Sequence, residues 1–396
     1  MTTGRIFPKI ISFAIPIILT NYLQLLYGAA DLVVVGRYAG HACLAAVGAT
    51  GSTTNLLLNL FIGLSVGAGV VFANAYGAQN REMCHRTVHT SMAVSAISGV
   101  FIAVVAILLA EPMLVMQKVP DDVLPLSILY IRIFFAGSPF NLIYNFGASI
   151  LRASGDTKRP LYFLALSGMI NVILNLLFVL VFGMTVDGVA LATVISQIIS
   201  AVLVVLSLMK NEGYSRYIIS KTRIYKEELI KILKIGIPSG LNGVIFSVSN
   251  LLIQTSINTF NKVAMAGVTA ASSIEGFTYH CMVAFSQAAG TFSGQKHGAK
   301  KYSRMKPILL NCLLLASLSG LVVAIISYIF GGPLLGIYLK DSPDAVYYGM
   351  LRLELFAFTY FLHGMAEVYL GMLRGWGRSF GPAMVSLFSH RLHIQN

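Results

Sequence analysis

The residues of this chain that could do chemistry are a few acidic and amide side chains inside long apolar segments. Asp31 stands near the end of one such segment. Polar positions precede it at helical spacing and share one helix face, namely Tyr27, Gln24 and then Asn21 or Thr20. An ionisable group in a membrane segment is a functional candidate by default. A carboxylate beside amides and hydroxyls can bind a proton or Na⁺, and a polar network that only serves packing is the alternative.

Further polar stripes occupy the first half of the sequence. Their members are Asn55 and Asn59, then Ser138, Asn141 and Asn145, then Ser167, Asn171 and Asn175. Lipid cannot satisfy such groups, so we expect the stripes to face one another inside the fold. We predict that Asn145, Asn171 and Asn175 form a cation or proton site with Asp31. Gln24 and Tyr27 are predicted to line an adjoining substrate cavity.

The second half offers three carboxylates inside apolar segments, at Glu275, Glu354 and Glu367. Glu367 is related to Asn145 by a shift of 222 residues, and each lies seven residues before an arginine. A carboxylate that faces a cavity would attract organic cations, so we predict that Glu275 and Glu367 line the substrate cavity. A salt bridge to the neighbouring arginine is the alternative role for Glu367. Glu354 lies close to Arg352 and is expected to be structural.

Motifs of soluble enzymes are missing from the sequence. It contains no P-loop, no glycine-rich dinucleotide motif after a strand and no His-Glu-x-x-His motif. The four cysteines are scattered without the paired spacing of a zinc site or a disulfide framework. We therefore expect neither an enzyme nor a cofactor nor a resident metal. Any pumping must draw on a gradient of H⁺ or Na⁺, with Na⁺ as a transported ion at Asp31.

The composition places these residues in a membrane. Of 396 residues, 56% are hydrophobic and only 11% are charged, whereas soluble domains carry about 25% charged residues. Stretches long enough to cross a bilayer, about 20 residues each, predict an all-α polytopic membrane protein. They lie near 10–35, 45–73, 88–110, 124–150, 161–183, 187–209, 232–258, 263–292, 307–330 and 347–373, and an eleventh starts at Pro382.

The basic residues predict the orientation. Lysines and arginines number 28 against 15 acidic residues. Twenty-one of them fall in one set of loops, which includes the N-terminus, and four in the opposite set. Basic residues collect on the cytoplasmic side, so we expect a cytoplasmic N-terminus in the cell (inner or plasma) membrane. The positive charge is then topological, and no nucleic-acid partner is expected.

The two halves of the sequence are copies of each other. The stretch from Lys9 to Pro16 matches that from Lys231 to Pro238, with a shift of 222. Six helices per copy make both copies enter the membrane from the same side, which predicts parallel repeats about an axis along the membrane normal and a cavity between them. The expected organisation is a first lobe at 1–209, a cytoplasmic linker at 210–230 and a second lobe at 231–396.

The second copy ends before it is complete. By the same shift, residues 389–396 align with an apolar stretch in the fifth helix of the first copy, yet they carry Arg391. We expect a chain truncated near Phe388, with ten complete helices and part of an eleventh.

The repeated motifs carry a family resemblance. They are Leu151–Pro160 and Glu367–Pro382, supported by Tyr27-x-x-x-Asp31-x-x-x-x-Gly36, Gly77-Ala-Gln79 and Gly294–Ala299. From about Ile6 to Phe388 the chain resembles the multidrug and toxic compound extrusion (MATE) family. The resemblance implies a V-shaped pair of six-helix lobes that exchange organic cations for Na⁺ or H⁺. It puts the family's first-helix aspartate at Asp31 and its fifth-helix polar pair at Asn171 and Asn175.

The resulting hypothesis is a cation-coupled multidrug antiporter whose first helix bends at Pro16 when Asp31 binds its ion. Asn175 replaces an aspartate found in many members, which argues against proton schemes that need two carboxylates in the first lobe. The expected partners are the lipid bilayer and small organic cations, without an obligate protein partner. A lipid-linked substrate flippase and an inactive truncated product are the alternatives.

Overall fold

The regular elements of the structure, a computed structural model, are helices throughout the residues it describes, which are 4–117, 119–257, 262–339, 342–357 and 359–381. Along the chain they are α1 (Ile6–Val34), η1 (Val35–Ala39), α2 (His41–Gly77), α3 (Arg81–Met116), α4 (Leu124–Ala136), α5 (Ser138–Ser154), α6 (Lys158–Leu176), η2 (Leu177–Val181), α7 (Val186–Lys210), η3 (Ile219–Lys221), α8 (Lys226–Ile257), α9 (Lys262–Gly298), η4 (Tyr302–Arg304), α10 (Met305–Tyr338), α11 (Pro343–Ala357) and α12 (Tyr360–Gly375).

Many of these helices are long and apolar enough to cross a bilayer. Within the described residues seven meet that test, or eight if the bent pair α4 and α5 counts as one span. The longest helices, α2 and α9, have 37 residues each, about 55 Å at 1.5 Å per residue. A hydrocarbon core is about 30 Å thick, so both helices extend beyond it. The predicted all-α membrane fold is confirmed.

One of the predicted spans is broken into two helices. Between α4 and α5 the axis bends by 46° at Gly137. Pro139 lacks a backbone N–H and suits the first turn of a helix, so α5 begins there as a new helix. In the equivalent span of the second half α11 ends at Ala357 and α12 begins at Tyr360, with residue 358 outside the described part. The described part therefore has twelve α-helices where the sequence predicted ten complete ones, and the predicted eleventh span and the tail 389–396 lie outside it.

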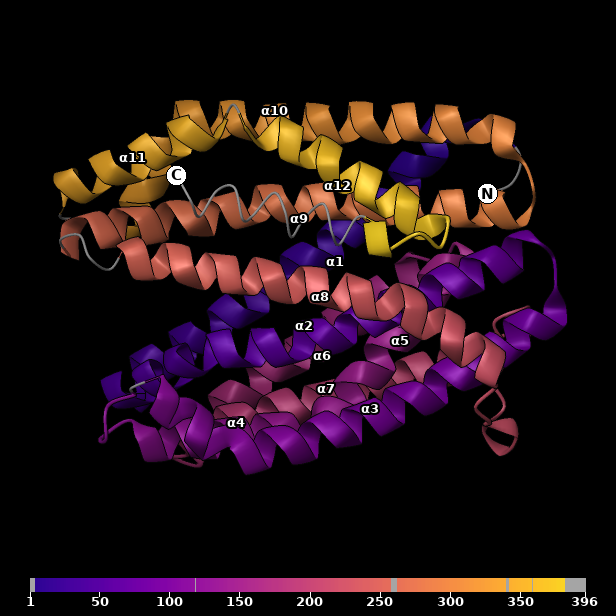
Figure 1. The fold of residues 1–396 in the computed structure, drawn as a ribbon. Helices are drawn as coiled ribbons and strands as arrows, with labels where there is room; N and C mark the ends of the chain where they lie inside the picture. The colour runs from indigo at the N-terminus through magenta and orange to yellow at the C-terminus, as the bar shows by residue number, and fades with distance from the viewer. Residues whose placement is uncertain (1–3, 118, 258–261, 340–341, 358, 382–396) are drawn as a thin grey trace.

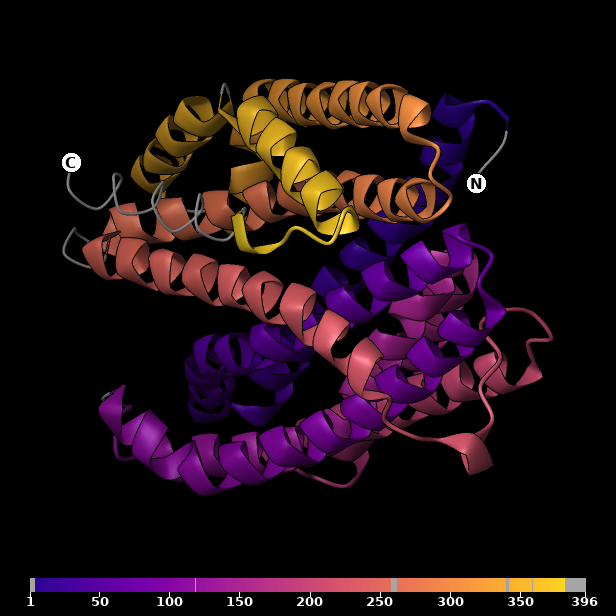
Figure 2. The same cartoon turned by 45° about the vertical axis from the view of Figure 1, so that its right-hand side comes forward.

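The helices of the two halves gather on opposite sides of the molecule. Figures 1 and 2 show α2–α7 on one side and α9–α12 on the other, with α8 between them. α2 packs closely on α8, because a Cβ added at Gly63 would stand 2.2 Å from the nitrogen of Gly240. Gly67 meets the carbonyl of Ile232 in the same way, at 2.5 Å. The expected lobe boundaries stay a prediction.

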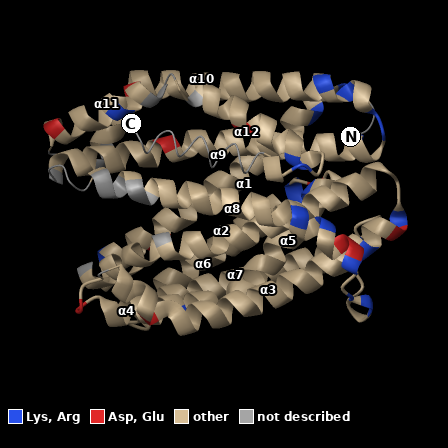
Figure 3. Ribbon diagram, in the orientation of Figure 1, with Lys and Arg blue, Asp and Glu red and all other residues tan. Residues whose placement is uncertain are grey.

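Most lysines and arginines gather at one end of the bundle, as Figure 3 shows. We call this end, where α1, α3, α6, α8 and α10 begin, the basic end. The linker expected at 210–230 lies here and contains η3 and the first turn of α8. At the same end α1 packs on α9, where the ring of Phe13 meets that of Phe292 edge-on at 5.4 Å between centroids.

Candidate functional site

Asp31 lies in the last turn of α1 against α6. The side-chain amide of Asn175 donates a hydrogen bond to Asp31 Oδ1, and it also reaches Asn171 Oδ1 at 3.3 Å. Asn171 in turn donates to Thr193 Oγ1 on α7 at 3.4 Å. Asn171 and Asn175 are four residues apart, so both face α1 from one side of α6. The structure thus brings together Asp31, Asn171 and Asn175, three of the four residues predicted for the cation site.

The chemistry available at this site is that of oxygen ligands. The Asp31 carboxylate is partly buried, whereas Asn171 and Asn175 are 4% and 0% exposed. The Oδ1 atom of Asn175 is buried and has no hydrogen-bond partner among the described residues. Carboxylate and amide oxygens suit a hard cation such as Na⁺. A carboxylate whose partner is a neutral amide can equally take up a proton without leaving an unpaired cation behind.

Asn145, the fourth predicted member of the cation site, lies elsewhere. Its amide donates to the backbone oxygen of Asn141 at 2.9 Å and to the side-chain oxygen of the same residue at 3.0 Å. Both asparagines line a cavity between the two halves of the molecule. No hydrogen bond joins Asn145 to Asp31 in the described part, because α5 turns Asn145 toward that cavity while α6 supplies the partners of Asp31.

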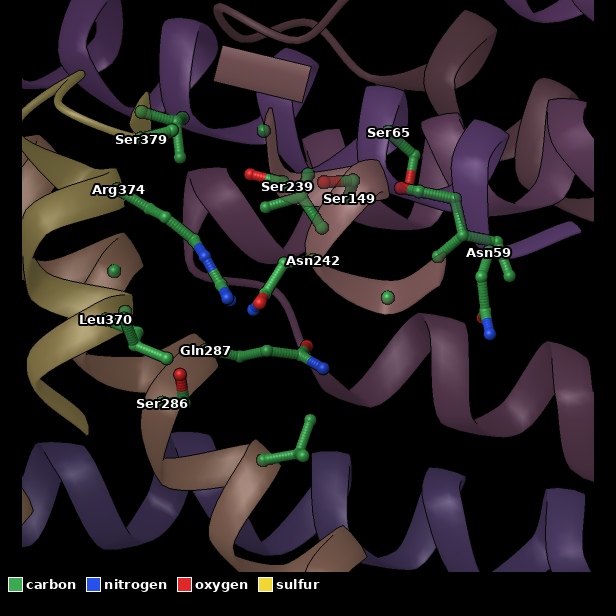
Figure 4. A pocket seen from close by; sticks show the side chains of 18 of the residues that line it. Asn59, Ser65, Ser149, Ser239, Asn242, Ser286, Gln287, Leu370, Arg374 and Ser379 are labelled. Carbon is green, nitrogen blue, oxygen red and sulfur yellow. The ribbon is translucent and has the colours of Figure 1, made fainter. Parts of the chain in front are cut away.

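The cavity has a volume of about 2110 Å³ and is lined by α1, α2, α5, α8, α9 and α12. Gln24 and Glu367, both predicted for a substrate cavity, are part of its wall. Figure 4 shows a portion of this wall, in which the side chains of Arg374 and Asn242 point toward each other and Gln287 lies close by. The polar groups come from both halves of the sequence. The described structure shows no ion pair between Glu367 and Arg374, the alternative role considered for Glu367.

Tyr27 and Glu275, the other two residues predicted for the cavity, lie outside its lining. The Tyr27 hydroxyl donates to the backbone oxygen of Ala165 at 3.2 Å, and its ring fills the space over Gly168, where a Cβ would stand 1.9 Å from Cζ. Tyr27 therefore packs between α1 and α6. Gly168 on α6 makes room for this ring, which the pattern within α1 could not reveal.

Glu275 forms a buried ion pair with Arg352. Nε and Nη2 of Arg352 donate to the two carboxylate oxygens of Glu275, each at 2.9 Å. The Glu275 side chain is 8% exposed. A buried carboxylate needs a counter-charge, and Arg352 supplies it from α11 across to α9. Glu354, expected to be structural beside Arg352, is exposed.

A reciprocal contact joins the two halves near the basic end, and the sequence reasoning missed it. Asn74 at the end of α2 donates to the backbone oxygen of Gly375 at 3.2 Å, and Gln295 at the end of α9 donates to that of Ala153 at 2.7 Å. Donors and acceptors are related by shifts of 221 and 222 residues, so the two bonds are repeat copies of each other. We call this pair of bonds the clasp.

Two glycines allow the helices of the clasp to approach. A Cβ at Gly77 would stand 2.0 Å from the oxygen of Gln295, and one at Gly298 would stand 1.9 Å from the oxygen of Asn74. These glycines are repeat mates in the sequence. Their match was the available signal, because paired glycines near two helix ends are typical of a close backbone crossing.

Comparison with known proteins finds one family whose model matches each half of the chain. The MatE family model matches residues 16–177 and 238–395. The probable multidrug resistance protein YoeA of Bacillus subtilis is 28% identical over 386 residues, covering 95% of this chain and 83% of that protein. The probable multidrug resistance protein YpnP of the same organism is 26% identical over 389 residues, covering 98% and 86%.

A solved structure is similar over nearly the whole chain. It is described as the outward-facing conformation of a multidrug resistance MATE family transporter, and it has a TM-score of 0.91 and 23% identity, covering 97% of this chain and 86% of that one. The second family match continues to residue 395. The expectation that the resemblance stops at Phe388 is therefore wrong. The chain belongs to the MatE family, whose members are multi-pass membrane transporters and not enzymes.

Proposed function

We propose that this chain exports drugs and other organic cations across the cell membrane in exchange for H⁺ or Na⁺. Two things support the proposal: the relatives named above are multidrug resistance proteins, and a cavity of about 2110 Å³ lies between the two halves. In this proposal the basic end faces the cytoplasm, because lysines and arginines collect on that side. The gradient of the coupling ion supplies the energy for export, so the proposal includes no cofactor.

The observation that carries the proposal is the contact of Asp31 with Asn175 inside the helical bundle. Asn175 is fully buried, and its remaining amide oxygen has no partner among the described residues. An ion bound between this oxygen and the carboxylate would join α1 to α6 more firmly than the single hydrogen bond does. Ion binding then favours one arrangement of α1 over another, which is what coupling requires.

Helix α1 is placed to carry this effect to the second half. Near its start Phe13 packs on Phe292, and in its middle Asn21 donates to the backbone oxygen of His280 at 3.1 Å, both on α9. Its far end is held by α6 through Tyr27 and Asp31. Pro16 lies inside α1, between Phe13 and Asn21. In our proposal α1 bends at Pro16 when Asp31 binds its ion, and the two halves rock between two states that expose the cavity to opposite sides.

The test is efflux of a cationic dye from proteoliposomes that contain the purified chain. A gradient of H⁺ or of Na⁺ is imposed in separate samples, which also identifies the coupling ion. We expect Asp31→Asn to reduce efflux to the background of empty liposomes, because the neutral amide neither binds a proton nor attracts Na⁺.

The matched control is Asp122→Asn, which removes a carboxylate from an exposed loop. It should export at the rate of the unsubstituted chain. Efflux at that same rate by Asp31→Asn would refute the role of Asp31. Failure of the unsubstituted chain to export under either gradient would refute cation-coupled drug export.

A further inference from the structure

The charges that line the cavity are mostly positive. Among the described lining residues the acidic side chain is Glu367, and the lysines and arginines are Arg152, Lys234, Arg374 and Arg378. A wall of this charge attracts a group that carries a negative charge.

Arg152 and Arg374 come one from each half and line the same cavity. They are repeat mates, with a shift of 222, and stand near the ends of α5 and α12. Both are partly buried in the cavity wall. Among the described residues neither guanidinium has a carboxylate partner. The ion pairs of the described structure involve other arginines. Figure 4 shows the side chain of Arg374 directed toward Asn242.

The clasp holds these two arginines in place. Each of them directly precedes an acceptor of the clasp, since Gln295 binds the oxygen of Ala153 and Asn74 binds that of Gly375. The backbone beside each arginine is therefore fixed from the opposite half of the molecule. Arginine presents several N–H donors in a planar fork that fits the oxygens of a carboxylate or phosphate.

Glu367 supplies the opposite charge within the same cavity. It lies on α12 seven residues before Arg374, about 10 Å along the helix axis. The cavity thus offers an anionic point and a cationic pair at a separation that a drug-sized molecule can span.

We propose that Arg152 and Arg374 together bind the carboxylate or phosphate group of a zwitterionic amphiphile whose cationic group lies at Glu367. The inference rests on the proposed function and adds to it a preference, among the organic cations exported, for molecules that carry both charges. The competing role for the two arginines is topological, as positive charges that merely keep their helix ends on the cytoplasmic side.

The experiment uses two xanthene dyes that differ at one group: a rhodamine with a free carboxylate, which is zwitterionic, and its methyl ester, which is a plain cation. Binding of each dye to the purified chain is measured by fluorescence anisotropy, and efflux is measured in proteoliposomes. We expect the zwitterion to bind more tightly than the ester. Arg152→Gln and Arg374→Gln should each weaken zwitterion binding by about tenfold, the size of one charge-assisted hydrogen bond, and leave ester binding within about twofold.

Two further sets of variants separate binding from folding and topology. Arg152→Lys and Arg374→Lys keep the charge and should retain more zwitterion binding than the glutamine variants. Lys158→Gln removes an exposed positive charge beside α5 without touching the cavity and should change neither dye.

The outcomes distinguish this inference from the exporter proposal. Equal affinity of the unsubstituted chain for both dyes, or an equal loss of both in the glutamine variants, would overturn the inference. A zwitterion preference that depends on the two arginines, without efflux of either dye, would support the inference while refuting the exporter.

Discussion

The two halves of the molecule treat their membrane carboxylates in opposite ways. In the first half Asp31 contacts the neutral amide of Asn175. In the second half both oxygens of Glu275 are bound by Arg352, each at 2.9 Å. A carboxylate beside an amide can gain or lose a cation while its partner stays neutral. A carboxylate bound by a guanidinium cannot, because protonation would leave a buried cation without its counter-charge.

The comparison indicates that the two duplicated halves use their carboxylates for different purposes. In the proposed function the first half keeps the site that exchanges ions, whereas the buried carboxylate of the second half joins α9 to α11. The same divergence shows at the repeat mates Asn145 and Glu367, which face one cavity with a neutral and an acidic side chain. Where the halves remain alike, at the clasp, they meet each other directly.

The largest expected effect comes from breaking the ion pair of Glu275 and Arg352. Arg352→Gln leaves Glu275 buried without its counter-charge, which should destabilise the fold by about 3–5 kcal/mol. Denaturation of the purified protein in detergent measures this loss. By contrast, Asp31→Asn should change stability far less while abolishing transport. A stability loss of equal size in both variants would show that the two carboxylates contribute equally to the stability of the fold.

A smaller effect is expected at the amide of the exchangeable site. Asn175→Leu keeps the approximate volume and removes the hydrogen bond to Asp31 together with the unpartnered oxygen. If the coupling ion is Na⁺, the loss of the Asn175 oxygen as a ligand, about 1.5–3 kcal/mol, corresponds to roughly 10- to 150-fold weaker Na⁺ binding. The measurement is the ion concentration that gives half-maximal efflux. An unchanged midpoint would exclude Asn175 from the ion site.

The smallest effect is expected at the clasp, where the two halves are alike. Asn74→Leu and Gln295→Met each remove one bond of the clasp, and each should cost about 1 kcal/mol of stability. Because the two bonds are repeat copies, the two losses should be similar. Both variants should also make a cysteine introduced at Ser149, in the cavity wall, more reactive toward a polar thiol reagent added at the basic end. A strong loss in one variant alone would show that the clasp is not symmetric in energy.

Much of this arrangement was predictable from the sequence. The predicted apolar spans fall on observed helices, two of them in the case of 124–150. The polar face leading to Asp31 and the face carrying Asn171 and Asn175 followed from helical spacing. The break at Gly137 was missed because an apolar stretch of 27 residues has the composition of a single span. Glu275 was wrongly expected in the cavity. Its partner Arg352 is 77 residues away along the chain, so no local pattern in the sequence reveals the ion pair.

The sequence by itself determined the membrane class, the spans and the duplication, because composition and short-range periodicity are properties of each segment alone. Only the tertiary structure decided which polar side chains meet. The direction in which a helix face points depends on how the helix is rotated against its neighbours, and packing between distant segments sets that rotation. Gly168 decides where Tyr27 lies, and paired glycines at the ends of α2 and α9 decide where the two halves close.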